Sequence, residues 1–163
     1  MTEEVNAEEV PGMRILAQED DPDGYSPEDL FTADVALHAL LVAVLGYGVD
    51  GDGRIDLTFV FDGVPVSGTV VPPAVWQRGV IRTLRSAGID RTENVSDELL
   101  EEWDVIARGL EHHAYTRMSA GLHAPAPLHI HMEDVVIGSP AGARIPFWRG
   151  LRSEITGWSL GKM

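Results

Sequence analysis

The feature that most constrains this fold is a stretch of strict two-residue alternation that continues on both sides of one tight turn. Every second residue from Ile55 to Phe61 is apolar, which is typical of a strand with one buried face. The pair Asp62-Gly63 follows and favours the positive backbone angles of a two-residue hairpin turn. Alternation resumes over residues 64–71. The sequence therefore predicts a β-hairpin whose second strand bends at Gly68.

Helical spacing flanks this hairpin on both sides. Before it, we expect a helix that Ser26 caps and that ends near Leu45. After it, Pro73 predicts the start of a helix that ends near Ser86, and Ser96 caps a second helix that ends at about residue 113. The expected buried faces are Leu37, Leu40, Leu41, Val44 and Leu45 in the first helix, Trp76, Val80, Ile81 and Leu84 in the second, and Leu99, Leu100, Trp103, Ile106, Ala107 and Leu110 in the third.

The chain returns to β patterning after a loop expected over residues 116–127. Alternation from Leu128 predicts a third strand that continues to Ile137, and two more strands follow at about Ile145–Leu151 and Glu154–Leu160. The sequence thus predicts an α+β domain. Its core is a small, strongly bent, five-stranded antiparallel sheet or barrel, with an N-terminal helix and a helical insert at about 73–113 between strands two and three.

Residues 1–30 differ from the rest of the chain in charge. They hold ten acids and one arginine, and so carry −9 of the formal net charge of −14. Such a segment buries too little apolar surface to offset the entropy lost on ordering. We expect an acidic, disordered arm at 1–30 before a single domain at 31–163. The arm either keeps the protein in solution or attracts a basic partner.

The composition also bears on the class of protein. The absence of cysteine excludes disulfides, thiol nucleophiles and iron–sulfur clusters, and the negative charge disfavours nucleic-acid binding. An N-terminal signal pattern and an apolar run of about 20 residues are both missing, so we expect a cytoplasmic protein outside the membrane. Motifs for acyl transfer, phosphate loops and dinucleotides are missing too. We therefore expect no enzyme and no cofactor.

His129 and His131 share one face of the expected third strand. Two imidazoles on a strand bind a metal only with further ligands. A pH response of the pair is a second reading, because histidine titrates near neutrality, and a plain polar strand face is a third. We expect no metal, and a metal- or small-ligand-binding β-barrel stays as the alternative function. The candidate third ligands are His112, His113, His123 and Glu133.

The β segments resemble two groups of known proteins. The stretches "IDLTFVFDGVPVSGTVV", "PLHIHMEDVVIG" and "IPFWRGLRSEITGWSLG" are similar to the strands of a small Sm-like or SH3-like barrel. The hairpin through "VSGTVV" and the ending "WRGLRSEITGWSLGKM" resemble the GvpU-type gas vesicle accessory proteins, over about residues 35–163. The positions of the ending that match are Trp148, Arg149, Gly150, Ser153, Glu154, Gly157, Trp158, Ser159, Leu160 and Gly161.

The second resemblance implies a cytoplasmic, non-enzymatic protein associated with gas vesicles. It would contact shell or other accessory proteins, or further copies of itself, in vesicle assembly or clustering. We expect Trp148, Arg149, Arg152 and Trp158 to form the partner-binding patch, because Trp and Arg are frequent at interface hot spots. The alternative is that both tryptophans lie in the core and the arginines are solvated. An Sm-like RNA-binding protein is a further alternative, which the net charge disfavours.

Overall fold

The fold is built on an open antiparallel sheet with the strand order β4-β3-β2-β1-β5. A computed structural model describes residues 21–26, 34–46, 51–88, 95–125 and 127–163 of the chain. The predicted α+β class and the five-stranded sheet are confirmed, and the sheet does not close into a barrel. The strands are β1 (Ile55–Phe61), β2 (Val64–Val70), β3 (His129–Ile137), β4 (Ala143–Leu151) and β5 (Ile155–Leu160).

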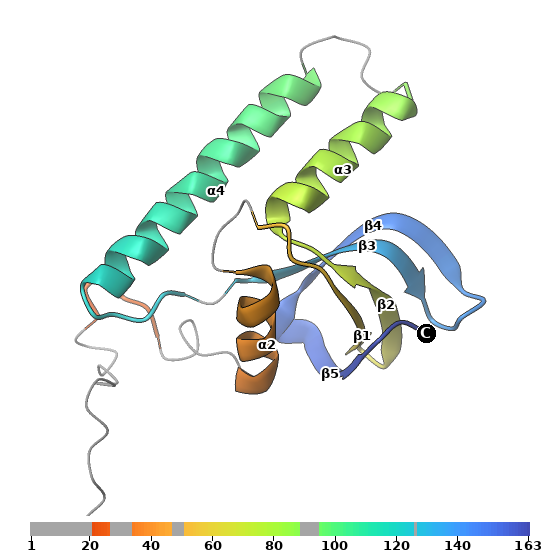
Figure 1. The fold of residues 1–163 in the computed structure, drawn as a ribbon, viewed down its shortest axis with the longest axis horizontal. Coiled ribbons are helices and arrows are strands. Elements are labelled where there is room, and N and C mark those ends of the chain that lie inside the picture. Colours follow the sequence, from red (N-terminus) through yellow and green to blue (C-terminus); the bar gives the residue numbers. More distant parts are fainter. Residues whose placement is uncertain (1–20, 27–33, 47–50, 89–94, 126) are drawn as a thin grey trace, which may run out of the picture.

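The described residues form three helices in addition to this sheet. Helix α2 (Val35–Leu45) lies beside the sheet, whereas α3 (Pro73–Ser86) and α4 (Val95–Ser119) form an antiparallel pair that projects from it (Figure 1). The pair follows β2 as predicted, and α3 has the predicted bounds. Helix α4 continues to Ser119 and so extends into the loop expected from residue 116. A short 3-10 turn, η2 (Arg152–Glu154), joins β4 to β5.

The core lies between α2 and one face of the sheet. Leu57 and Phe59 of β1 have no exposed surface, as their alternation predicts, and Leu37 of α2 is only 1% exposed. Of the other residues expected to be buried in α2, Leu41 is buried and the rest are half-buried. The buried core cluster comprises Leu37, Leu41, Leu57, Phe59, Val66, Val70, Ile130, Met132 and Val135.

The N-terminal cap of α2 differs from the expectation. The helix begins at Val35, and the Asp34 carboxylate accepts a hydrogen bond of 2.8 Å from the backbone N–H of Leu37. Asp34 is extended, with φ −118° and ψ 93°. An extended residue at this point cannot lie inside a helix, so a cap at Ser26 for the helix that ends at Leu45 is wrong. Residues 27–33 lie outside the described part of the chain.

The bend expected at Gly68 coincides with a bulge on the neighbouring strand. The register between β2 and β3 shifts by one residue between Ser67 and Thr69, opposite Asp134, whose φ is +52°. A Cβ on Gly68 would lie 2.9 Å from the Glu133 carbonyl oxygen, so only glycine fits here without a shift. The extra residue changes the alternation of β3. This is why Met132 and Val135, three positions apart, both face the core.

Helix α3 contacts the sheet through a glycine. A Cβ on Gly79 would lie 2.1 Å from Cζ of Phe147 in β4, whereas a Cβ on Gly109 of α4 would meet nothing within 4 Å. We expect Gly79→Ala to lower the free energy of unfolding by about 1–3 kcal/mol, because the ring must move. Gly109→Ala should raise it by up to about 1 kcal/mol through helix propensity. Urea unfolding of both variants checks this, and equal changes would contradict the close contact.

Candidate interaction surface

Helix α4 exposes apolar side chains along much of its length. Ile106 and Leu110 are 60% and 65% exposed and lie one turn apart on the same side of the helix. Trp103, one turn before them, is half-buried. We call Trp103, Ile106 and Leu110 the α4 face. Exposed apolar side chains on other sides of α4 are Val105, Tyr115 and Met118.

The exposure of the α4 face corrects the expected burial of this helix. Of the predicted apolar face, Ala107 is buried, Leu99, Leu100 and Trp103 are half-buried, and Ile106 and Leu110 are exposed. The physical reason is a difference in length, since α3 has 14 residues and α4 has 25. Helix α3 pairs with the first part of α4, where the Trp76 and Trp103 rings lie 6.1 Å apart. Apolar residues therefore recur at helical spacing along a part of α4 that α3 does not cover.

The last turns of α4 hold part of the N-terminal segment. The side chain of Arg117 is 2% exposed, and its Nη2 lies 2.6 Å from Oδ2 of Asp21. The guanidinium also pairs with Asp23 and lies 4.7 Å from the centre of the Tyr25 ring. A cation in the last turn of a helix also interacts favourably with the helix dipole. Residues 21–26, within the expected arm, are thus attached to the end of α4.

This attachment predicts a dependence on pH. The hydrogen bond from Arg117 lowers the pKa of Asp21 from 3.8 to about 2. Because the pKa is lowered, the carboxylate stabilises the folded chain above pH 3.8 and loses this effect as pH falls towards 2. We expect wild type to lose more unfolding free energy than Asp21→Asn over this interval. Denaturant titrations at each pH measure it, and parallel curves for the two proteins would contradict the assignment.

The histidine pair on β3 lies beside a cation and an aromatic ring. His129 Nδ1 is 3.0 Å from a guanidinium nitrogen of Arg149, and the His131 ring lies 5.2 Å from that of Trp76. Burial, with Arg149 and His129 nearby, lowers the pKa of His131 to about 4. The neighbouring positive charge makes this an unfavourable place for a metal cation. In the part of the chain that the structure describes, no group of three His, Asp or Glu side chains is placed to hold a metal ion.

The four predicted partner-binding residues do not form one exposed surface. Trp148 packs edge-on against Phe61, with ring centres 4.7 Å apart, and Trp158 donates a hydrogen bond of 2.5 Å to Asp34. Arg152 is 8% exposed. Arg149 is exposed and, as the neighbour of Trp148 in a strand, points to the other face of the sheet. A partner-binding role for these residues stays a prediction.

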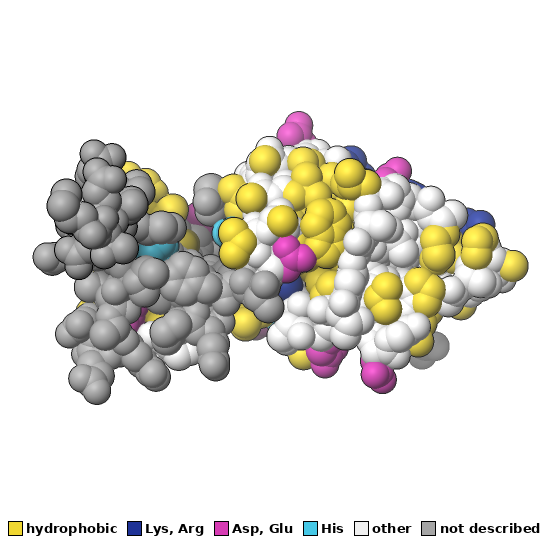
Figure 2. Space-filling view, turned by 90° about the horizontal axis from the view of Figure 1, so that it is seen from below, with side chains coloured by type: hydrophobic (Ala, Val, Ile, Leu, Met, Phe, Trp, Pro, Cys, Tyr) yellow, Lys and Arg dark blue, Asp and Glu magenta, His cyan; other side chains and the backbone are white. Residues whose placement is uncertain are grey.

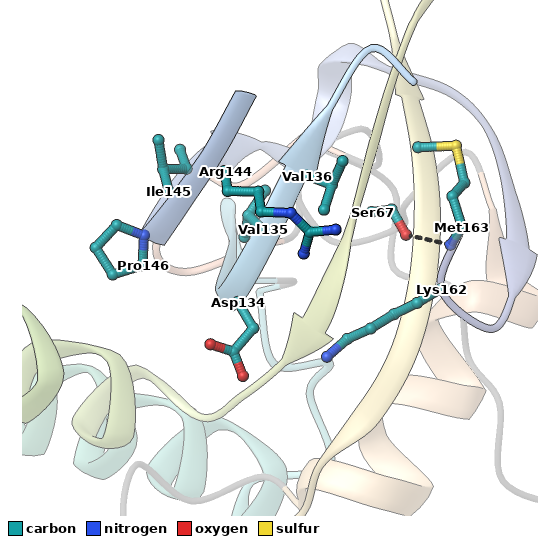
Figure 3. A pocket seen from close by; sticks show the side chains of 9 residues that line it. All are labelled: Ser67, Asp134, Val135, Val136, Arg144, Ile145, Pro146, Lys162 and Met163. Atoms are coloured by element: carbon teal, nitrogen blue, oxygen red, sulfur yellow. Dashed lines mark hydrogen bonds between the residues drawn. The ribbon is translucent and has the colours of Figure 1, made fainter. Parts of the chain in front are cut away.

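A groove lies where the C-terminal residues fold back over the sheet. Its volume is about 450 Å³, and the backbone N–H of Met163 donates a 2.9 Å hydrogen bond to the buried hydroxyl of Ser67 (Figure 3). The groove offers a ligand both negative charge, from Asp134, and positive charge, from Arg144 and Lys162. Its lining residues are Ser67, Asp134, Val135, Val136, Arg144, Ile145, Pro146, Lys162 and Met163.

A further apolar area lies near α2. Seen from below, hydrophobic side chains gather in the middle of the molecule, over the region of α2 and β5 (Figure 2). Helix α2 contains no Asp, Glu, Lys or Arg, and its first residue, Val35, is 70% exposed.

Among the helices that the structure describes, none combines the length and hydropathy that a membrane crossing requires.

The comparison with known families settles the affiliation of the chain. Residues 36–163 match the family model described as gas vesicle protein GvpU-like. The chain belongs to the GvpU-like family. The match extends from α2 to the end of the chain and confirms the resemblance carried by the hairpin and the C-terminal signature. No curated protein and no solved structure matches the chain.

Sequence reasoning about this GvpU-like protein missed two features of the surface. The exposure of Ile106 and Leu110 could have been predicted, because the helix expected from Ser96 was already longer than the helix expected before it. The pairing of Arg117 with Asp21 had none, since these residues are separated by 96 positions and follow no periodic pattern. Both features lie on α4, which makes this helix the most distinctive part of the described surface.

Proposed function

We propose that this GvpU-like protein acts on gas vesicles through protein–protein contacts, in vesicle assembly or clustering, and not by catalysis. The observation that carries the proposal is the exposure of Ile106 and Leu110 on a helix that projects from the sheet (Figure 1). Membership of the family supports the vesicle context. Contiguous exposed apolar side chains are typical of interaction sites.

The chemistry of the α4 face supports one kind of partner. Trp103, Ile106 and Leu110 follow the spacing by which an amphipathic helix inserts into a hydrophobic groove. The first turns of the helix add acids and no base over residues 97–104. A gas vesicle protein with an apolar groove bordered by basic side chains would therefore fit this face. In such a contact α4 would face the vesicle, and the sheet would lie further from the vesicle surface.

A flotation experiment tests the proposal. Purified full-length protein is mixed with gas vesicles prepared from cells that lack it, and the vesicles are collected by flotation. We expect the protein to float with the vesicles and light scattering to report a change in vesicle clustering. Protein that stays in the lower fraction at every concentration would contradict a direct contact with vesicles.

A further inference from the structure

Hydrogen-bond donors lie close together on the side of the sheet that α3 contacts. His129 and His131 of β3 have their ring centres 6.3 Å apart, and the His131 ring lies against that of Trp76 in α3. Arg149 of β4 is the strand partner of His131 and contacts His129. We call His129, His131, Arg149 and Trp76 the donor cluster.

The contact between Arg149 and His129 fixes the position of one imidazole proton. A guanidinium has N–H groups and no acceptor, so the 3.0 Å contact from Nη2 of Arg149 requires a lone pair on Nδ1 of His129. The proton of the neutral ring is then on Nε2, which becomes a donor. Burial lowers the pKa of His131 to about 4, so this ring is also neutral near pH 7 and carries one N–H group, whichever nitrogen holds it.

Trp76 supplies a further donor, and this one has no partner. Within the described residues, its Nε1 is buried and makes no hydrogen bond. Buried side-chain donors are nearly always paired with protein, water or a bound ion. The ring that carries this nitrogen lies 5.2 Å from that of His131, measured between ring centres. The cluster thus offers N–H groups from two strands and a helix, whereas Nδ1 of His129 is already used as an acceptor.

The sheet and α3 do not neutralise the charge of Arg149. In the part of the chain that the structure describes, Arg149 contacts His129 and forms no salt bridge. Glu133, on the same strand as the histidines, already pairs with Arg54. Helix α3 contains no acid. Because the pKa of both histidines is lowered, the positive charge of the cluster near pH 7 is that of Arg149.

The acids of α4 lie on other sides of that helix. All acids over residues 97–104 are exposed, and two of them pair with nearby arginines. The side of α4 turned to Trp76 is apolar, and its half-buried or buried residues are Leu99, Leu100, Trp103 and Ala107. This apolar side lies between the acids of α4 and the donor cluster.

We propose that the donor cluster binds a dianionic phosphate group, either as free phosphate or as the phosphate of a small metabolite. Such a group has several acceptor oxygens and no donor, and its tetrahedral oxygens can accept from two strands and a helix together. A guanidinium matches the geometry of phosphate oxygens and adds charge to the hydrogen bonds. The proposal concerns a small ligand and does not depend on the function proposed for the α4 face.

NMR signals of the side chains test this site on the full-length protein. Inorganic phosphate and glycerol phosphate are added in separate titrations at constant pH and ionic strength, with acetate as a carboxylate for comparison. We expect saturable shifts of the imidazole signals of His129 and His131 and of the indole N–H signal of Trp76. The signals of His112 and His123, outside the cluster, should not move. Tighter binding of inorganic phosphate would identify free phosphate as the ligand, and tighter binding of glycerol phosphate a phosphate monoester.

Two arginine variants of β4 make the test specific. R149Q should raise the dissociation constant of the tighter ligand about tenfold or more, because charge-assisted hydrogen bonds are lost. R144Q removes another exposed arginine of the same strand and should bind as wild type does. Shifts that do not saturate, equal losses in the two variants, or equally tight binding of acetate would overturn the proposal. Both arginines are exposed, so thermal melting should stay near wild type and exclude unfolding as the cause.

Discussion

The double variant I106E/L110E is expected to raise the dissociation constant of the protein for gas vesicles, measured by flotation, at least tenfold. Both side chains belong to the α4 face, and a loss of about 1.4 kcal/mol in binding free energy already gives a tenfold change in the dissociation constant. Removing a buried apolar anchor from an interface often costs more than this. Because both side chains are mostly exposed, the free energy of unfolding should change by no more than about 0.5 kcal/mol per site.

The control for this variant uses the same helix and the same change of charge. V105E/Y115E replaces two apolar side chains that are 65% and 66% exposed and lie on other sides of α4. We expect this protein to float as wild type does. Equal losses in the two variants would show that added negative charge, and not the α4 face, is responsible. Normal flotation of I106E/L110E would remove the face from the contact.

The second large effect concerns the core under α2. Phe59 is fully buried between α2 and the sheet, and Phe59→Ala should lower the free energy of unfolding by about 3–5 kcal/mol. This is a large part of the stability of an ordinary domain, about 5–15 kcal/mol. Thermal and urea unfolding, followed by circular dichroism, measure the loss.

Phe61 provides the comparison for Phe59. Both residues belong to β1 and their rings are 6.1 Å apart, but Phe61 is only half-buried at the edge of the core. Phe61→Ala should therefore cost clearly less than Phe59→Ala. An equal or larger loss at Phe61 would contradict the placement of the core centre beneath α2.

Local patterns account for the parts of the fold that could be predicted. Two-residue alternation and Asp62-Gly63 define the first hairpin, because side-chain direction and turn geometry are properties of neighbouring residues. The bounds of α3 agree with the structure because Pro73 favours a helix start and Gly88 a stop. The start of α2 could not be chosen in the same way. Ser26 and Asp34 are both competent caps, and the Trp158 side chain that also binds Asp34 lies 124 positions away.

The interaction surface was harder to predict than the fold. A helical period shows that Ile106 and Leu110 lie on one side of α4, but not whether another element covers that side. Arg152 illustrates the opposite error: its charge suggested a solvated or partner-binding side chain, and the structure buries it near His38, with Nη1 3.2 Å from Nδ1. Whether a single polar residue is buried depends on contacts between distant segments, and such contacts produce no periodic pattern in the sequence.

The position of β5 has a consequence for the synthesis of the chain. This last strand pairs with β1, the first strand, and its Trp158 binds the residue that caps α2. Until residues 155–160 leave the ribosome, β1 therefore keeps an unpaired edge of the kind through which strands of different chains associate. The nascent domain is complete only when almost all of its sequence has emerged.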